Sequence, residues 1–185
     1  MKDREIKMKN MSIRNMVFTA LFAALICVAS PFVIPIGPIP LSLATLAIYL
    51  AASVLNWKYG TLAVIVYILL GAVGLPVFSG FTGGVQKLVG VTGGFIIGYI
   101  PCAFVIGLLV DKFELKKWIY PVAMVLGTIV LYACGTAWFI HVTGAPFQKA
   151  LTLCVLPFLL GDAIKIALAS LIAPVLRKTL KKQVI

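Results

Sequence analysis

Acidic side chains are scarce in this sequence. The 185 residues include only 5 Asp and Glu against 16 Lys and Arg, and charged residues make up 11% of the chain. A soluble domain is usually about one quarter charged. The chain is also 62% hydrophobic, with a mean hydropathy of +1.13, and a water-soluble globule of this size cannot bury so much apolar surface. The composition therefore excludes an ordinary soluble fold and predicts that lipid surrounds the chain.

Residues that carry catalysis or hold metals are few as well. There is one His, at position 141, and none of the four Cys stands in a CxxC pair. The sequence has no HExxH or GxSxG pattern and no GxxxxGK[ST] phosphate loop. We therefore expect no metal, no cofactor and no catalytic residue, and we interpret the cysteines as small buried hydrophobes.

The net charge of +11 would suggest nucleic-acid binding in a soluble protein. Here the basic residues gather at the two ends of the chain, in segments 1–14 and 177–185, and in short turns. Membrane topology and the anionic inner leaflet explain this distribution better. We therefore expect the lipid bilayer, and no nucleic acid, to be the partner of these cations.

Proline, glycine and charge divide the chain into six apolar helices. No charged residue lies between Arg14 and Lys58, and four prolines within residues 31–40 must break this run into two helices. The expected spans are Ile13–Ser30, Ile39–Leu55, Tyr59–Leu75, Gly93–Val110, Trp118–Ile140 and Lys149–Leu176, the last bent at Pro157. We predict an all-α polytopic membrane protein in which residues 1–185 form one integral-membrane domain with no separate soluble domain.

Six spans would place both ends of the chain on one side of the membrane. Of the 16 basic residues, 13 fall on that side, only Lys87 and Lys149 fall on the other, and Lys165 lies within the last span. The positive-inside rule then predicts that both termini are cytoplasmic.

The last span carries two charges, Asp162 and Lys165, within its apolar sequence. Each costs roughly 2.5–3.5 kcal/mol at the centre of a spanning helix. Residues three apart share a helix face, and counting back from Arg177 places Asp162 about 22 Å above the cytoplasmic end. Such a pair can bind a polar ligand, or it can be a self-satisfied ion pair that locks helix packing.

A glycine-rich segment, Ser79–Gly94, separates the third and fourth spans. Six of its 16 residues are glycine, and it also holds Gln86 and Lys87. Glycine lets the backbone approach a ligand closely. The segment is either a lid over an outward-facing pocket or a merely flexible loop.

Small residues at Ala20, Ala23 and Ala24 mark the first span. Small residues four apart let helices approach closely. This face therefore serves either the packing of the bundle itself or the docking of another membrane subunit.

Four segments, in order, resemble the BioY family, the biotin-binding S components of energy-coupling factor (ECF) transporters. They are PIGPIPLSLATL (Pro35–Leu46), LLGAVGLPVF (Leu69–Phe78), VTGGFIIGY (Val91–Tyr99) and PFLLGDAIK (Pro157–Lys165). The resemblance covers roughly residues 12–180. Three positions depart from the family, which often has Gln, Pro and Tyr where this chain has Ala44, Val91 and Phe95.

The resemblance implies a six-helix subunit in a bacterial or archaeal plasma membrane that captures biotin from outside. It implies that Asp162 and Lys165 line the biotin cavity. It also implies that the first helix docks on an ECF coupling subunit, which two cytoplasmic ATPases drive. An S component for another vitamin, such as thiamine or riboflavin, is the nearest alternative. A small membrane-embedded enzyme or a channel is an alternative of another class.

Biotin fits these residues chemically. A carboxylate at Asp162 can accept from urea N–H groups, and an ammonium at Lys165 can donate to the urea carbonyl. We expect Lys87 to bind the tail carboxylate, assisted by Gln86, Thr92 and the backbone at Gly93 and Gly94. Aromatic side chains would contact the rings and the tail, and the candidates are Trp57, Tyr67, Phe78, Phe81 and Phe95.

Overall fold

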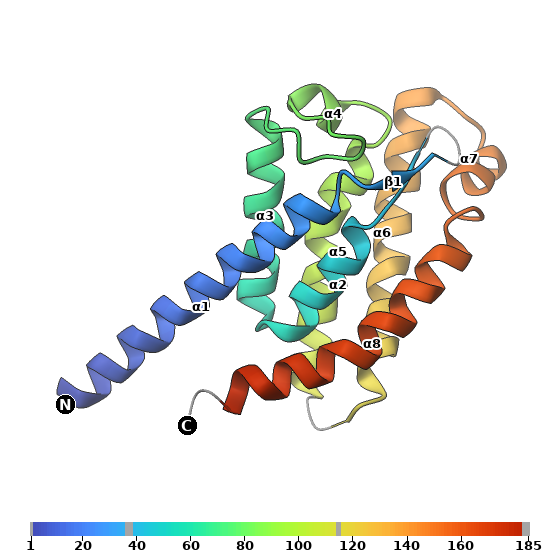
Figure 1. Ribbon diagram of the computed structural model, residues 1–185. Coiled ribbons are helices and arrows are strands. Elements are labelled where there is room, and N and C mark those ends of the chain that lie inside the picture. Colours follow the sequence, from blue (N-terminus) through green and yellow to red (C-terminus); the bar gives the residue numbers. More distant parts are fainter. Residues whose placement is uncertain (1, 36–38, 114–115, 183–185) are drawn as a thin grey trace.

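The architecture comes from a computed structural model that describes residues 2–35, 39–113 and 116–182; for residues 2–12 and 181–182 it describes the backbone alone. The middle of the proline-rich segment, Glu114 in the charged turn, and the basic side chains of residues 2–9 and 181–182 are therefore expectations that lie outside this description. The described residues are predominantly helical, as predicted (Figure 1).

Eight helices and one pair of two-residue strands make up the described fold. In chain order they are α1 (Lys2–Ala29), β1 (Val33–Ile34), β2 (Leu41–Ser42), α2 (Ala44–Val54), α3 (Trp57–Ala72), α4 (Val85–Val89), α5 (Gly93–Lys112), α6 (Ile119–Thr143), α7 (Phe147–Cys154) and α8 (Leu159–Lys182).

Local sequence explains several of these boundaries. The Asn56 side chain accepts a hydrogen bond from the backbone N–H of Lys58 and so caps the start of α3. Gly144 ends α6 in the left-handed conformation, with φ of 66°, which glycine adopts without a steric cost.

Three helical stretches are long and apolar enough to cross a membrane: Gly93–Lys112, Ile119–Thr143 and Phe147–Leu180. Three shorter apolar helices cover Ile13–Ala29, Ala44–Val54 and Trp57–Ala72. The six apolar segments of the sequence thus all form helices, while the number of complete membrane crossings stays a prediction.

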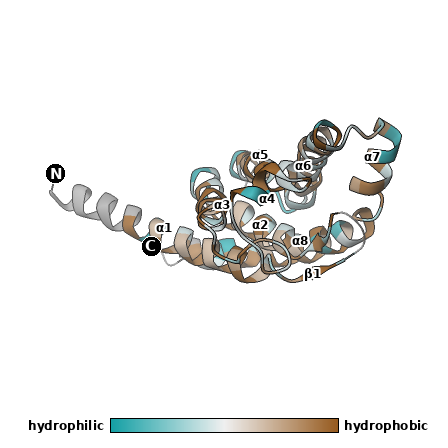
Figure 2. Cartoon of the chain, turned by 90° about the horizontal axis from the view of Figure 1, so that it is seen from above, coloured by the Kyte–Doolittle hydropathy of each residue, from teal (hydrophilic) through white to brown (hydrophobic). Residues whose placement is uncertain are grey.

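Helix α2 lies at the centre of the bundle. It packs against α1, α3, α5 and α8, while α5 also packs against α6 and α3. Figure 1 shows α1 and α8 running obliquely across the other helices toward the same end of the molecule. Seen from above, the helices carry much brown, hydrophobic colour (Figure 2), as expected where the surroundings are lipid.

The structure differs from the sequence-based bounds at several points, and α1 begins at Lys2 and not at Ile13. The second helix starts at Ala44, five residues later than expected, because β2 pairs antiparallel with β1 (Val33 opposite Ser42, Ile34 opposite Leu41) before the helix begins. The glycine-rich segment contains the short helix α4. The interruption expected at Pro157 is present, but it is a complete break and not a bend, because a turn that contains Pro157 separates α7 from α8.

Candidate functional site

The two charges of the last span form a buried ion pair near the start of α8. Lys165 Nζ lies 3.0 Å from Asp162 Oδ1, and the two residues are only 6% and 4% exposed. Lys165 Nζ also donates to the carbonyl of Ser42 at 2.6 Å and to Thr45 Oγ1 at 2.8 Å. All three N–H groups of the ammonium therefore have acceptors.

The strand pair holds the Ser42 carbonyl at this position. Ser42 Oγ donates to the carbonyl of Ser30 at 2.7 Å and accepts from the backbone N–H of Ala44 at 3.0 Å. Gly161 allows α8 to approach closely, because a Cβ there would lie 2.8 Å from Leu41 Cδ2. The segment between α1 and α2 thus forms one wall of the charged site.

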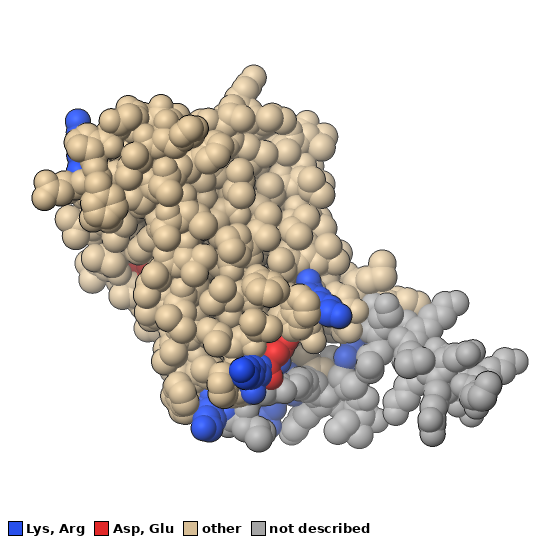
Figure 3. All heavy atoms as spheres, turned by 180° about the vertical axis from the view of Figure 1, so that it is seen from behind, with Lys and Arg blue, Asp and Glu red and all other residues tan. Residues whose placement is uncertain are grey.

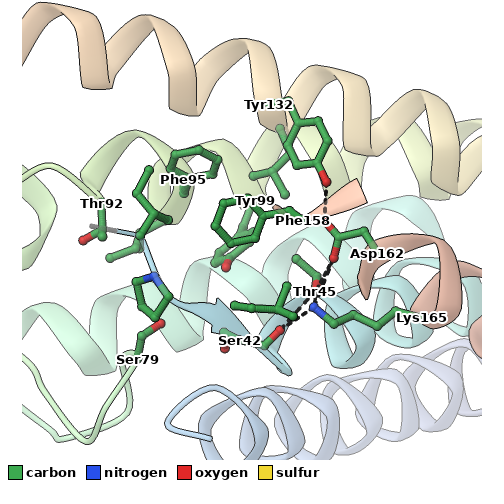
Figure 4. A pocket seen from close by; sticks show the side chains of 15 residues that line it. Ser42, Thr45, Ser79, Thr92, Phe95, Tyr99, Tyr132, Phe158, Asp162 and Lys165 are labelled. Carbon is green, nitrogen blue, oxygen red and sulfur yellow. Dashed lines mark hydrogen bonds and ion pairs between the residues drawn. The ribbon is translucent and has the colours of Figure 1, made fainter. Parts of the chain in front are cut away.

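A tyrosine completes the site from a third element. Tyr132 of α6 donates its hydroxyl to Asp162 Oδ2 at 2.6 Å, and Figure 4 shows the phenol pointing at the carboxylate from the side opposite Lys165. A carboxylate offers about four lone-pair sites. Oδ1 receives Lys165 and, at a long 3.4 Å, Thr45. Asp162 therefore keeps accepting capacity, whereas Lys165 has no N–H left.

Two neighbouring cavities open at this end of the bundle. The inner one has about 40 Å³ of free space beside Asp162 and Lys165. The outer one has about 520 Å³ and lies beneath α4. They share four lining residues: Pro40, Ser79, Thr92 and Ile96. A path from the outer cavity to the charged pair therefore passes these residues.

Several predicted site residues meet at these cavities. Asp162, Lys165, Thr92 and Phe95 line the inner one. Those of the outer one are Thr92 again, Phe78, Gln86 and Lys87. The inner walls also include residues that the sequence analysis did not select: Leu131 and, labelled in Figure 4, Ser42, Thr45, Ser79, Tyr99, Tyr132 and Phe158. Polar side chains within apolar helices, such as Thr45 and Tyr132, were the available signal.

Trp57 is not part of this site. It begins α3, where its backbone N–H donates to Asp111 Oδ2 at 2.8 Å and its ring packs edge-on against Phe104. Asp111 lies at the far end of α5 from Thr92, on the order of 28 Å along a helix. The prediction also conflicts with the topology expected from the same sequence, which places the neighbouring Lys58 on the cytoplasmic side, away from an outward-facing pocket.

Three further candidates lie outside both cavities. Tyr67 is buried, its hydroxyl is hydrogen-bonded to Ser30, and its ring packs edge-on against the Phe78 ring. Phe81 is 63% exposed and packs on Phe32. The backbone N–H of Gly93 donates to the Gly90 carbonyl at 3.0 Å, so it is already used in the turn before α5.

The alanines of α1 divide between two surroundings. Ala20 and Ala24 are exposed, beside the exposed Val17, Leu21 and Val28. Ala23 is 2% exposed and belongs to the core. The expectation of one face for all three was therefore wrong for Ala23, because α1 packs against α2 and α3 and the bundle buries Ala23 while it leaves Ala20 and Ala24 exposed.

Comparison with known proteins identifies the family. The BioY family model matches residues 3–182. This chain belongs to the BioY family. Among its relatives, the biotin transporter BioY of Thermotoga maritima is 45% identical over 89% of this chain and 96% of its own length. The probable biotin transporter BioY of Pyrococcus horikoshii is 38% identical over 88% of this chain and 96% of its own.

A solved structure with the same fold agrees with this assignment. The crystal structure of the S component for biotin from an ECF-type ABC transporter superimposes with a TM-score of 0.85. It is 30% identical, and the match covers 91% of this chain and 93% of the other. With its apolar helices, this BioY-family chain is a membrane protein.

Proposed function

We propose that this chain is the membrane-embedded biotin-binding subunit of an ECF-type transporter. It captures biotin on the outer side and delivers it inward as a non-catalytic S component. The observation that carries this proposal is the buried Asp162–Lys165 pair at the inner cavity, in a chain whose relatives are named biotin transporters. Those names favour biotin over thiamine or riboflavin, and a transporter over an enzyme or a channel.

The charged pair suits a neutral group that both donates and accepts hydrogen bonds. The opposite charges of Asp162 and Lys165 cancel, so a neutral urea ring fits better than an ion. Asp162 has accepting capacity for the urea N–H groups. Lys165 can reach the urea carbonyl only by giving up one of its present acceptors, for example Thr45 Oγ1.

The biotin tail would extend from the inner cavity past Thr92 and Ser79 into the outer one. Lys87 lines the outer cavity, and its ammonium would bind the tail carboxylate, with Gln86 beside it. Phe78 and Phe95, one in each cavity wall, would contact the apolar rings and tail. The Gly93 N–H has no part in this arrangement, because it is bonded within its own turn.

Binding requires the structure to open. Cavities for ligands of this size are roughly 300–1,000 Å³, and the inner cavity has about 40 Å³. We infer that the segment from Ser79 to Gly94 moves outward and joins the two cavities. None of the residues in α4 is fully buried, and Leu88 is the α4 side chain that packs against the core, so α4 can move at the cost of few core contacts.

Biotin specificity is tested directly by calorimetry on the purified protein with biotin, thiamine and riboflavin. Heat of binding with biotin alone is the expected result. Saturable binding of thiamine or riboflavin in place of biotin would show that the chain is specific for another vitamin, and it would overturn the proposal.

We also propose that the chain is one substrate-binding domain that works with an ECF coupling subunit and two cytoplasmic ATPases. The exposed apolar face around Ala20 and Ala24 would contact the coupling subunit. Both termini would be cytoplasmic, since 13 of the 16 basic residues fall on their side. Reporter fusions at residues 1 and 185 should both give a cytoplasmic signal, and an external C-terminus would contradict this orientation.

A further inference from the structure

A groove separate from the biotin site lies between the start of α6 and the last turns of α8. It has a volume of about 740 Å³. Its lining residues are Lys117, Trp118, Pro121, Ser170, Leu171, Pro174, Val175, Lys178 and Thr179. The biotin site uses none of these residues, and the groove lies at the end of the bundle that the proposed topology places in the cytoplasm.

The groove combines a basic mouth with an apolar floor. Lys117 and Lys178 stand at the ends of their elements, directly before α6 and near the end of α8. Within the described residues, neither ammonium has a hydrogen bond or an ion pair. Figure 3 shows Lys and Arg side chains gathered at the lower end of the molecule, where these elements end. Two cations with no acidic partner among the described residues would attract an anion.

The floor runs from this mouth into the depth of the membrane. Ser170 lies eight residues before Lys178, a separation of about 12 Å along a helix. The side chains between them that line the groove are Leu171, Pro174 and Val175, and Leu171 and Val175 are 72% and 65% exposed. The compact side chains of Ser170, Pro174 and Pro121 leave the space that makes the groove hollow.

An aromatic residue indicates the depth of the groove mouth in the membrane. Trp118 is 57% exposed, and the ammonium of Lys116 lies 5.8 Å from the centre of its ring. Tryptophan is enriched where hydrocarbon meets head groups. A molecule seated in the groove would therefore have its charge at head-group depth and its apolar part in the hydrocarbon.

We propose that this groove binds one anionic phospholipid. Lys117 and Lys178 hold the phosphodiester, Trp118 lies at the head-group boundary, and one acyl chain follows Leu171, Pro174 and Val175. Each basic residue near an anionic surface adds to the attraction for anionic lipid, so both lysines are needed for marked selectivity. The bound lipid would tie the α5–α6 turn to the end of α8.

Native mass spectrometry of the purified chain in detergent tests this proposal, with phosphatidylglycerol and phosphatidylcholine of identical acyl chains as probes. Phosphatidylglycerol should bind at least about tenfold more tightly than phosphatidylcholine. The double variant Lys117→Gln/Lys178→Gln should lose this preference. The matched control Lys58→Gln/Lys112→Gln removes two lysines outside the groove and should keep it.

A second variant tests the acyl-chain track. Ser170→Phe fills the groove without a change in charge, and it should weaken binding of both lipids. Biotin affinity, measured at the other end of the bundle, checks that each variant is folded. A lipid preference that survives the Lys117→Gln/Lys178→Gln change, or that falls equally in the control, would overturn the proposal. A folded double variant that keeps the lipid but no longer assembles with a coupling subunit would also overturn it, since the groove would then be a protein-docking surface.

Discussion

The hydroxyl of Tyr132 donates to Asp162 Oδ2 at 2.6 Å, across 30 residues of sequence. Because Lys165 holds the other carboxylate oxygen, the plane of the carboxylate is fixed from both sides. This arrangement leaves the free lone pairs of Asp162 in a defined direction before any ligand arrives.

Loss of this hydroxyl should weaken biotin binding. Hydrogen bonds to charged groups contribute roughly 1.5–3 kcal/mol, so Tyr132→Phe should reduce affinity about tenfold or more in calorimetry. The control is Tyr49→Phe. It removes a buried hydroxyl of α2 that is hydrogen-bonded to Thr128 of α6, the helix that carries Tyr132, and Tyr49 lines neither cavity. It should lower stability and spare affinity. Unchanged binding by Tyr132→Phe would show that the hydroxyl does not orient Asp162 for the ligand, and tighter binding would show that the phenol competes with the ligand for Asp162.

A change at Asp162 separates a binding site from a purely structural pair. Asp162→Asn removes the charge at constant size, and in a binding site it should cost at least about 2 kcal/mol of biotin affinity while the fold survives. In a structural pair, Asp162→Asn would leave the buried ammonium of Lys165 without its carboxylate partner. Breaking a buried pair costs roughly 3–5 kcal/mol of stability.

Two measurements on each variant decide between these cases: the melting temperature without ligand and the biotin dissociation constant. Normal melting with lost affinity supports the site. A lowered melting temperature with normal affinity, restored by Asp162→Asn together with Lys165→Met, would refute it.

Lys87 should recognise the tail carboxylate. Lys87→Ala is expected to weaken biotin by roughly tenfold, as loss of a charge-assisted hydrogen bond would, and to affect a biotin amide much less. Lys149→Ala, which removes the other basic residue of the outer side from a position outside both cavities, should have no such effect. Equal losses for biotin and its amide would place the carboxylate elsewhere.

The segment Gly80–Gly94 should become ordered when biotin binds. If it is a lid, saturating biotin should protect it from limited proteolysis, since closure of a mobile segment is part of capture. Thiamine serves as the control ligand. An identical cleavage rate with and without biotin would show that the segment is a passive connection.

The exposed alanines of α1 should matter for transport and not for binding. Ala20→Gln with Ala24→Gln places bulky polar groups on the outer face, so biotin binding should persist while uptake is abolished, because close helix approach is blocked. Ala23→Gln is the contrasting variant, since Ala23 is in the core, and it should impair folding itself. A parallel loss of binding and uptake in the first variant would assign that face to the bundle's own packing.

The lipid surroundings, the order of the helices and the family follow from the sequence alone. Hydropathy, proline and glycine act locally, so the breaks at residues 31–40 and 79–94 are readable without any knowledge of packing. The Asp162–Lys165 pair is also a local feature, because residues three apart on a helix share a face.

Only the tertiary structure decided what surrounds that pair. Ser42, Thr45 and Tyr132 reach it from segments 30 to 123 residues away, and no local pattern contains such distances. The same reason explains why Ala23 is buried while Ala20 is exposed. In a chain where nearly every helix position is apolar, the side that faces the core is set by the neighbouring helices, so hydrophobicity alone cannot indicate it.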